Sequence, residues 1–204
     1  ENNVHDNTGG ILVFDLPDLV LKRGGHVRVY KNTIRDNNFD NFAPKGNIVA
    51  GVAAGTGILI LATNQVEVFD NQIINNKSIG TGIISYLMTE RPITDRDYYP
   101  YPTQISIHDN TYSRRREYPT RKGRMGLMFR FKLKFGKNVP DILWDGIPDA
   151  GYAHPATMDI CLRNNTGATF ANLDAANNFK NVSRDAGPHN CELRPLPNVT
   201  LTDR

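Results

Sequence analysis

The sequence predicts an all-β fold, a right-handed parallel β-helix in which short strands stack coil upon coil. The segment VRVYKNTIRDNN at 27–38 returns 39 residues later as VEVFDNQIINNK, and after the same interval again as ISIHDNTYSRRR. In each copy, apolar β-branched residues alternate with other side chains ahead of an asparagine, which is the pattern of a strand with one buried face. A repeat at a fixed period indicates a solenoid, each coil lying on the one before.

The repeated asparagines are expected to be structural. At one corner of successive coils, asparagine can adopt a tight turn and hydrogen-bond to the asparagine of the next coil. Such a ladder satisfies turn polar groups that would otherwise be buried without a partner. The predicted ladder residues are Asn2, Asn32, Asn71 and Asn110 in one column and Asn7, Asn37 and Asn76 in a second.

The repeat also suggests how the chain is divided. Residues 1–115 are predicted to form the coils, and because the opening residues match the middle of a repeat, we expect them to continue a longer solenoid. Arg115 replaces the asparagine of the second column, so the stack is expected to end there, since a charge blunts an open edge. Residues 116–138 are predicted to form a basic capping strand, because MFRFKLKFG alternates apolar and cationic residues. Residues 139–204 are expected to form an irregular C-terminal layer packed on the solenoid.

The two cysteines, Cys161 and Cys191, are predicted to form a disulfide that clamps this layer. The alternative is two buried free thiols. A disulfide closing a loop of about 30 residues would stabilise the fold by about 3–4 kcal/mol and would indicate an oxidising compartment. The spacing of cysteine and histidine matches no zinc site and no c-type haem attachment motif, so no structural metal is predicted.

The charge is distributed unevenly. Residues 114–137 contain ten Lys or Arg and a single acidic residue, whereas the whole chain has 24 basic and 21 acidic residues. A cationic edge of this kind attracts an acidic polysaccharide or an acidic protein. Nucleic acid is not expected, because no reading motif accompanies the charge, and no apolar run is long enough to span a membrane. The candidate binding residues here are Arg130, Lys132 and Lys134.

A tyrosine-rich loop, DRDYYPYP at 95–102, supplies the other candidate binding residues, Tyr98, Tyr99 and Tyr101. Rigid aromatic side chains in a loop suit sugar stacking or a protein interface. The alternative is a loop folded down over the coil, so that its rings cover the strands.

Candidate catalytic residues lie beside the asparagine ladder. Asp70 and Asp109 share the column before the asparagine, His108 is adjacent, and Arg114 follows shortly after. Carboxylates stacked one coil apart, roughly 4.8 Å, suit an acid–base pair or a calcium ion. The alternative is a solvated turn rich in Asp and Asn. No cofactor other than calcium is suggested.

Several runs carry a family resemblance, among them GNIVAGVAAGTGILILATNQVEVFDNQI, ILWDGIPDAG and HNCELRPLPNV. They resemble bacterial exported proteins with parallel β-helix repeats. The resemblance implies the β-helix fold and a location in the periplasm, on the outer membrane surface or outside the cell. It also implies a lipid anchor on a preceding segment and an exported partner similar to a c-type cytochrome. It implies no catalytic residues, since the role of that family is not established.

Two functions therefore remain open. In the first, the protein docks another exported protein, such as a c-type cytochrome, through its loops and cationic edge. In the second, it binds or modifies an acidic polysaccharide along a groove, in the manner of a lyase or epimerase. The first is slightly favoured, because no acid–base set is distinct from a solvated turn.

Overall fold

The computed structural model describes residues 1–198 and consists mainly of three parallel sheets. Sheet A contains β1 (Asn3–His5), β4 (Thr33–Arg35), β7 (Gln72–Ile74) and β10 (Thr111–Ser113). Sheet B contains, in spatial order, β13 (Phe170–Asn172), β11 (Ile142–Trp144), β8 (Ile79–Ile84), β5 (Thr56–Leu61) and β2 (Gly9–Phe14). Sheet C contains β12 (Ile160–Arg163), β9 (Thr103–His108), β6 (Asn64–Phe69) and β3 (Gly25–Tyr30). The predicted all-β parallel architecture is confirmed.

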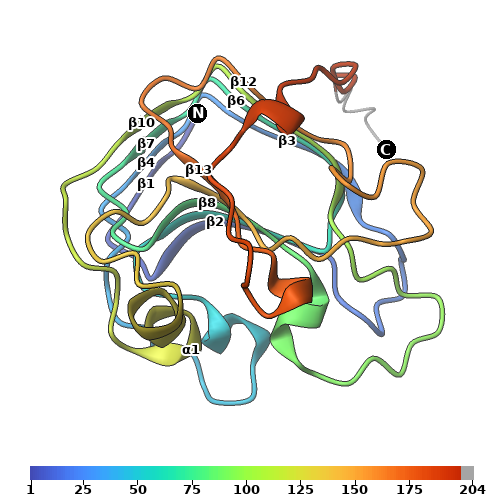
Figure 1. Cartoon of the computed structure of the whole chain (residues 1–204), viewed down its shortest axis with the longest axis horizontal. Helices are drawn as coiled ribbons and strands as arrows, with labels where there is room; N and C mark the ends of the chain where they lie inside the picture. Colours follow the sequence, from blue (N-terminus) through green and yellow to red (C-terminus); the bar gives the residue numbers. More distant parts are fainter. Residues whose placement is uncertain (199–204) are drawn as a thin grey trace, which may run out of the picture.

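The chain visits sheets B, C and A in turn, and each such circuit is called a coil below. Thus β5, β6 and β7 make one coil, and β8, β9 and β10 make the next. Each strand pairs with its counterpart in the register that the repeat predicts, with Val66 between Val27 and Ile105. Figure 1 shows the three sheets arranged around a shared interior. Inward side chains such as Ile58, Val68 and Ile107 fill it and are fully buried.

The outer face of sheet B is apolar as well, because its strands read as continuous apolar runs. Short helical segments cover that face (Figure 1). They are η1 (Ile48–Gly51), η2 (Tyr86–Thr89), α1 (Gly123–Leu127) and the π-helical turn η3 (Met128–Lys132). Two further turns, η4 (Ala175–Asn177) and η5 (Gly187–His189), follow β13.

The asparagine ladder runs from coil to coil at the corner between sheets C and A. The backbone N and side-chain Nδ2 of Asn71 both donate to Oδ1 of Asn110, at 3.0 and 2.9 Å. Asn32 donates to Asn71 in the same way. Asn71 Nδ2 also donates to the carbonyl oxygens of Val29 (2.8 Å) and Phe69 (2.9 Å), so one buried side chain joins three coils. The second column links Asn7, Asn37 and Asn76 similarly.

The stack does not end at Arg115, and that prediction is wrong. Asn110 donates to Oδ1 of Asn165 (3.2 and 3.0 Å), which extends the first ladder by a coil. Strand β11 pairs with β8, and β12 pairs with β9. A long excursion after β10 breaks the 39-residue period, so the sequence pattern does not reveal the returning strands. The predicted C-terminal layer therefore contributes three strands, β11, β12 and β13, to the sheets, while its residues 199–204 lie outside the described part of the chain.

The predicted basic capping strand at 116–138 is also wrong, since this region forms α1 and η3. A strand would place Phe129, Phe131 and Phe135 on one face, but Phe131 is 65% exposed whereas Phe129 and Phe135 are buried. The helical segment packs Phe129 against Leu143 and other residues on the outer face of sheet B. Covering that apolar face outweighs the alternating local pattern.

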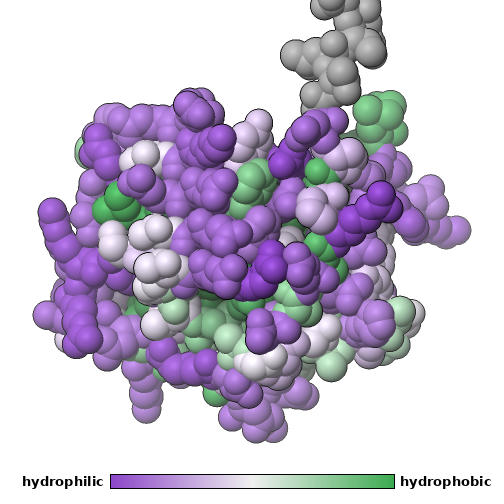
Figure 2. Space-filling view, turned by 90° about the horizontal axis from the view of Figure 1, so that it is seen from above, coloured by the Kyte–Doolittle hydropathy of each residue, from purple (hydrophilic) through white to green (hydrophobic). Residues whose placement is uncertain are grey.

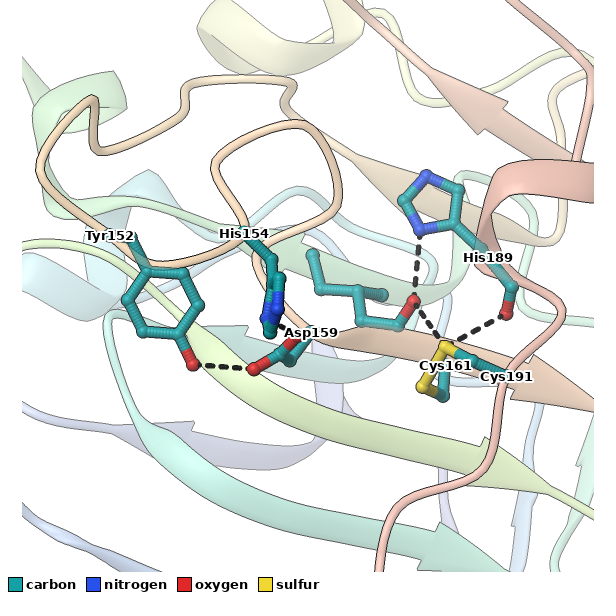
Figure 3. Close-up of a disulfide and its surroundings, with 7 residues drawn as sticks. Tyr152, His154, Asp159, Cys161, His189 and Cys191 are labelled. Atoms are coloured by element: carbon teal, nitrogen blue, oxygen red, sulfur yellow. Dashed lines mark hydrogen bonds and ion pairs between the residues drawn. A yellow bond between two sulfur atoms is a disulfide. The ribbon is translucent and has the colours of Figure 1, made fainter.

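The predicted disulfide is confirmed. Cys161 of β12 is bonded to Cys191, with 4.9 Å between their Cα atoms, and ties the C-terminal segment to sheet C (Figure 3). Beside it, the buried His189 donates from Nδ1 to the Ile160 carbonyl (2.9 Å). Burial lowers the pKa of His189, which favours the neutral imidazole. Within residues 1–198, no helix is both long and apolar enough to cross a membrane.

The ladder generates a stability prediction. Asn71→Ala should lower the free energy of unfolding by about 2–4 kcal/mol, because buried backbone groups on neighbouring coils lose their partner. Asn2→Ala is the matched control at the exposed end of the same column, and should cost less than about 1 kcal/mol. Urea unfolding of the two variants measures the difference. Equal losses of unfolding free energy in the two variants would contradict the stabilising role assigned to the buried ladder.

Asp145 generates a pH prediction. Its carboxylate is fully buried and accepts from the backbone N of Ser85 (2.7 Å) and of Ile147 (3.1 Å). Burial raises the pKa of Asp145 to about 6, partly offset by these hydrogen bonds. Because the raised pKa belongs to the folded state, the native protein takes up this proton first as the pH falls from 7 to 4.

Wild type should therefore gain stability relative to Asp145→Asn over that interval, by about 1–3 kcal/mol. Denaturant unfolding of both proteins at several pH values measures this gain. Parallel stability curves would show that Asp145 does not titrate as its burial requires.

Candidate functional site

A cleft lies on the outer face of sheet C, with a volume of about 560 Å³. Its floor is formed by side chains from successive coils, and residues 193–197 of the C-terminal segment form a wall. Figure 2 views the molecule from the sheet C side, where most of the surface is hydrophilic. The polar and charged lining residues are His26, Gln65, Glu67, Gln104, Ser106, Asp159 and Arg194.

Strand periodicity puts these residues in the cleft. Inward positions of β6 and β9 are Val or Ile, so the residues between them point outward. At the corner where each strand begins, Gln65 and Gln104 have φ values of 51° and 53°, and His26 and Asp159 take the same left-handed conformation. The cleft floor therefore repeats a polar side chain once per coil.

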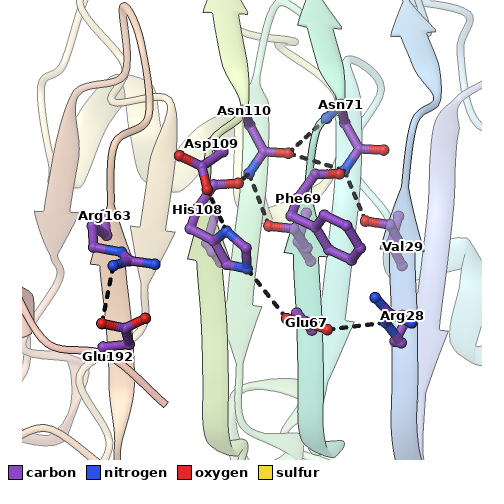
Figure 4. Close-up of polar contacts among 12 residues, drawn as sticks. Arg28, Val29, Glu67, Phe69, Asn71, His108, Asp109, Asn110, Arg163 and Glu192 are labelled. Atoms are coloured by element: carbon purple, nitrogen blue, oxygen red, sulfur yellow. Dashed lines mark hydrogen bonds and ion pairs between the residues drawn. The ribbon is translucent and has the colours of Figure 1, made fainter. Parts of the chain in front are cut away.

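Glu67 is the centre of a charged network beside the cleft (Figure 4). Its Oε2 accepts from Arg28 Nε on the preceding coil at 3.0 Å, and its Oε1 lies 3.3 Å from His108 Nε2 on the next. The other ring nitrogen of His108 lies 2.7 Å from Asp109 Oδ2. The Glu67 side chain is only 6% exposed, so the network compensates the burial of its charge. Arg28 also donates to Asn198, which holds the end of the described C-terminal segment over sheet C.

An aromatic column runs beside this network. The Tyr30 and Phe69 rings stack with centroids 5.0 Å apart, and Phe69 stacks on His108 at 5.3 Å. The Arg28 guanidinium lies 5.2 and 5.0 Å from the centroids of the first two rings. Because neighbouring ring faces are turned toward one another, this column stabilises the stack and leaves little ring face for a ligand.

The catalytic candidates separate into different surroundings. His108 and Asp109 are in contact, and the hydrogen bond from His108 lowers the pKa of Asp109. Asp70 is exposed at the same corner of the preceding coil, with a left-handed φ of 53° like that of Asp109. Arg114 does not join them. It donates to the carbonyls of Val139 (2.7 Å) and Lys77 (2.6 Å), and burial lowers its pKa.

Metal binding receives no support from side-chain clustering. Among residues 1–198, no group of three or more His, Cys, Asp or Glu side chains is placed to hold a metal ion. Calcium between Asp70 and Asp109 stays a prediction.

The tyrosine loop folds down over the coil, which is the alternative that the sequence left open. Tyr98 is 8% exposed and donates its hydroxyl to the Asp15 carbonyl at 2.8 Å. Tyr99 donates to Asp149 Oδ2 at 2.9 Å, and Tyr101 packs against the Tyr99 ring. Burial raises the pKa of Tyr98 and of Tyr99. The buried Tyr98 side chain therefore packs the loop onto the coil and does not present a binding surface.

The predicted cationic residues lie on the cover of sheet B and do not line the cleft. The Arg130 guanidinium lies 5.5 Å from the centroid of the exposed Phe131 ring. Lys132 Nζ lies 4.3 Å from the Phe179 ring centroid, and Lys134 is exposed. Their role in binding an acidic partner stays a prediction.

Sequence reasoning missed the principal residues of the cleft and of the charged network beside it. Glu67 and Arg28 were visible only as the polar members of an alternating pattern, although their 39-residue spacing places them side by side. The recurrence of glutamine at 65 and 104 was a usable signal for a repeated polar floor. The contact of residues 193–197 had no sequence signal, because it is non-local and outside the repeat.

Comparison of the chain with family models, with curated proteins and with solved structures finds no match. The side chains and their contacts are therefore the basis on which a function can be proposed.

The Glu67 network generates a further stability prediction. Glu67→Ala should destabilise the protein by about 1–3 kcal/mol, because Arg28 and His108 lose their shared acceptor. The matched control is Glu192→Ala, whose pair with Arg163 (3.0 Å) has side chains 62% and 38% exposed, and whose effect should stay within about 0.5 kcal/mol. Thermal or urea unfolding measures both. An effect of Glu67→Ala no larger than that of the control would show that the network contributes nothing measurable.

Proposed function

We propose that this protein binds an extended acidic polysaccharide in the cleft on the outer face of sheet C. The observation that carries the proposal is the repetition of polar side chains along a cleft of about 560 Å³. A linear polymer presents hydroxyl groups at regular intervals, and a stack of coils presents donors and acceptors at intervals of roughly 4.8 Å. The volume lies in the usual range of ligand sites.

The chemistry of the lining suits such a ligand. Gln65 and Gln104 each offer a donor and an acceptor on adjacent coils, and Ser106 adds a hydroxyl. Arg194 lines the same cleft, and it belongs to none of the ion pairs found within residues 1–198. A guanidinium of this kind matches a sugar carboxylate in a bidentate geometry.

The proposal is binding without bond cleavage. Glu67 is held by Arg28 and His108, and Asp159 accepts from the Tyr152 hydroxyl (2.8 Å) and lies 2.9 Å from His154 Nδ1. A lyase or epimerase needs a base and an acid within reach of the sugar. The carboxylates of the cleft already have partners, which favours recognition over catalysis.

The handedness of the coils and the cellular location of the protein are also part of this proposal. We infer that the coils wind as a right-handed β-helix, because parallel crossovers are right-handed in about 98% of cases. The disulfide supports an extracytoplasmic location, since such bonds persist in oxidising compartments. The resemblance to exported bacterial β-helix proteins agrees with this location.

Docking of another exported protein is the second candidate. The loop between β2 and β3 exposes Leu19, Val20 and Leu21, the last two at 97% and 85%. Adjacent exposed apolar side chains favour a protein contact. The predicted cytochrome-like partner would fit this loop better than the tyrosine loop, which is folded down.

Glycan binding provides the test. Calorimetry with alginate and polygalacturonate oligosaccharides should show binding that neutral dextran lacks. Gln65→Ala with Gln104→Ala should weaken it at least about tenfold, equivalent to about 1.4 kcal/mol. Arg194→Gln should weaken it because it removes the cation that meets the sugar carboxylate.

Gln72→Ala is the matched control, since Gln72 is an exposed glutamine on sheet A, and it should leave binding unchanged. Failure of the wild type to bind either acidic glycan would overturn the proposal. Retention of an exported protein through Val20 and Leu21 would then favour the second candidate.

A further inference from the structure

A second cavity, of about 200 Å³, lies between the outer face of sheet B and its helical cover. Its walls include Leu59 and Leu61 of β5, Ile84 of β8, and Met88 and Met128 of the cover. An engineered cavity of about 150 Å³ with similar walls stays dry and binds benzene. A space of this size therefore accommodates an apolar group of comparable or larger volume.

The cavity exists because two apolar clusters cover sheet B without meeting. One cluster surrounds Phe129 and Leu143, and the other surrounds Leu61 and Tyr86. The cavity has walls from both, with Ile79 of the first cluster and Leu61 of the second facing it. Unfilled apolar space in an otherwise close-packed protein forfeits dispersion contacts that a ligand can restore.

The lining of this cavity also includes cationic side chains. Arg91 and Arg124 both line it, and a neighbouring open space of about 420 Å³ shares Arg124 and adds Lys132. Arg124 is paired with Glu90, but the two side chains are 58% and 68% exposed. An ion pair this exposed is weak, so a ligand anion can replace the glutamate.

We propose that this cavity binds a single-chain amphiphile with a carboxylate head, a free medium-chain fatty acid. The chain lies between Leu59 and the methionines, whose flexible side chains adapt to irregular apolar ligands. The carboxylate lies against Arg91 and Arg124. This site is separate from the polysaccharide cleft, and neither proposal depends on the other.

Calorimetry with decanoate, and with decanol as its uncharged counterpart, tests the proposal. Decanoate should bind the wild type at least tenfold more tightly than decanol. The double variant Arg91→Gln with Arg124→Gln should bring decanoate to the level of decanol. Arg116→Gln is the control, since this exposed arginine lines neither space.

A second variant blocks the apolar part of the site. Leu59 lines the cavity from the outer face of sheet B and is only partly buried there, so Leu59→Trp places a larger side chain in the space. This variant should lose binding of both ligands. The proposal is overturned if decanoate does not bind, if it binds no better than decanol, or if Leu59→Trp leaves its affinity unchanged in a folded protein. Binding to phosphatidylglycerol vesicles without binding of free decanoate would also overturn it.

Discussion

The hydrogen bond from each corner asparagine to the next is the interaction on which the rest of this structure depends. It ties the backbone N and the side-chain amide of one coil to a single oxygen of the following coil. The residues before it, Lys31, Asp70 and Asp109, adopt left-handed φ values of 55°, 53° and 53°. Such a conformation is unfavourable for residues other than glycine unless the surroundings fix it. The ladder supplies that constraint and keeps the coils in register.

Register in turn decides what each outer face can do. Every coil has the same outward-facing positions, so similar residues at one position of successive coils form a column of side chains along the sheet. On sheet C two columns are polar and produce the charged network around Glu67 and the polar floor with Gln65 and Gln104, and an aromatic column runs beside them. On sheet B the outward positions are apolar, so that face requires a cover and retains a cavity beneath it. One scaffold therefore presents two surfaces of opposite chemistry.

The sequence predicted those parts of the fold that depend on local repetition. The strands at 27–30 and 66–69, the first ladder through Asn110 and the disulfide all follow from spacing and residue type. The sequence did not predict the return of the chain at β11, because the excursion after β10 removes the period. Nor did it predict α1 and η3, where burial of Phe129 against Leu143 overrides an alternating pattern. His108 and Asp109, which the sequence identified together, lie in the charged network beside the cleft. The residues that line the cleft were not identified, since the cleft depends on pairing between coils and on a non-local segment.

Native-state hydrogen exchange at the Asn71 backbone amide tests the central role of the ladder most directly. This amide donates to a side chain, Oδ1 of Asn110, at 3.0 Å. If the ladder holds the coils together, the amide should exchange only through global unfolding. It should then belong to the most slowly exchanging amides of the protein, and its exchange rate should depend on denaturant as steeply as global unfolding does. Exchange of Asn71 as rapid as that of the exposed Lys45 would contradict the account, because the ladder would then open without the stack.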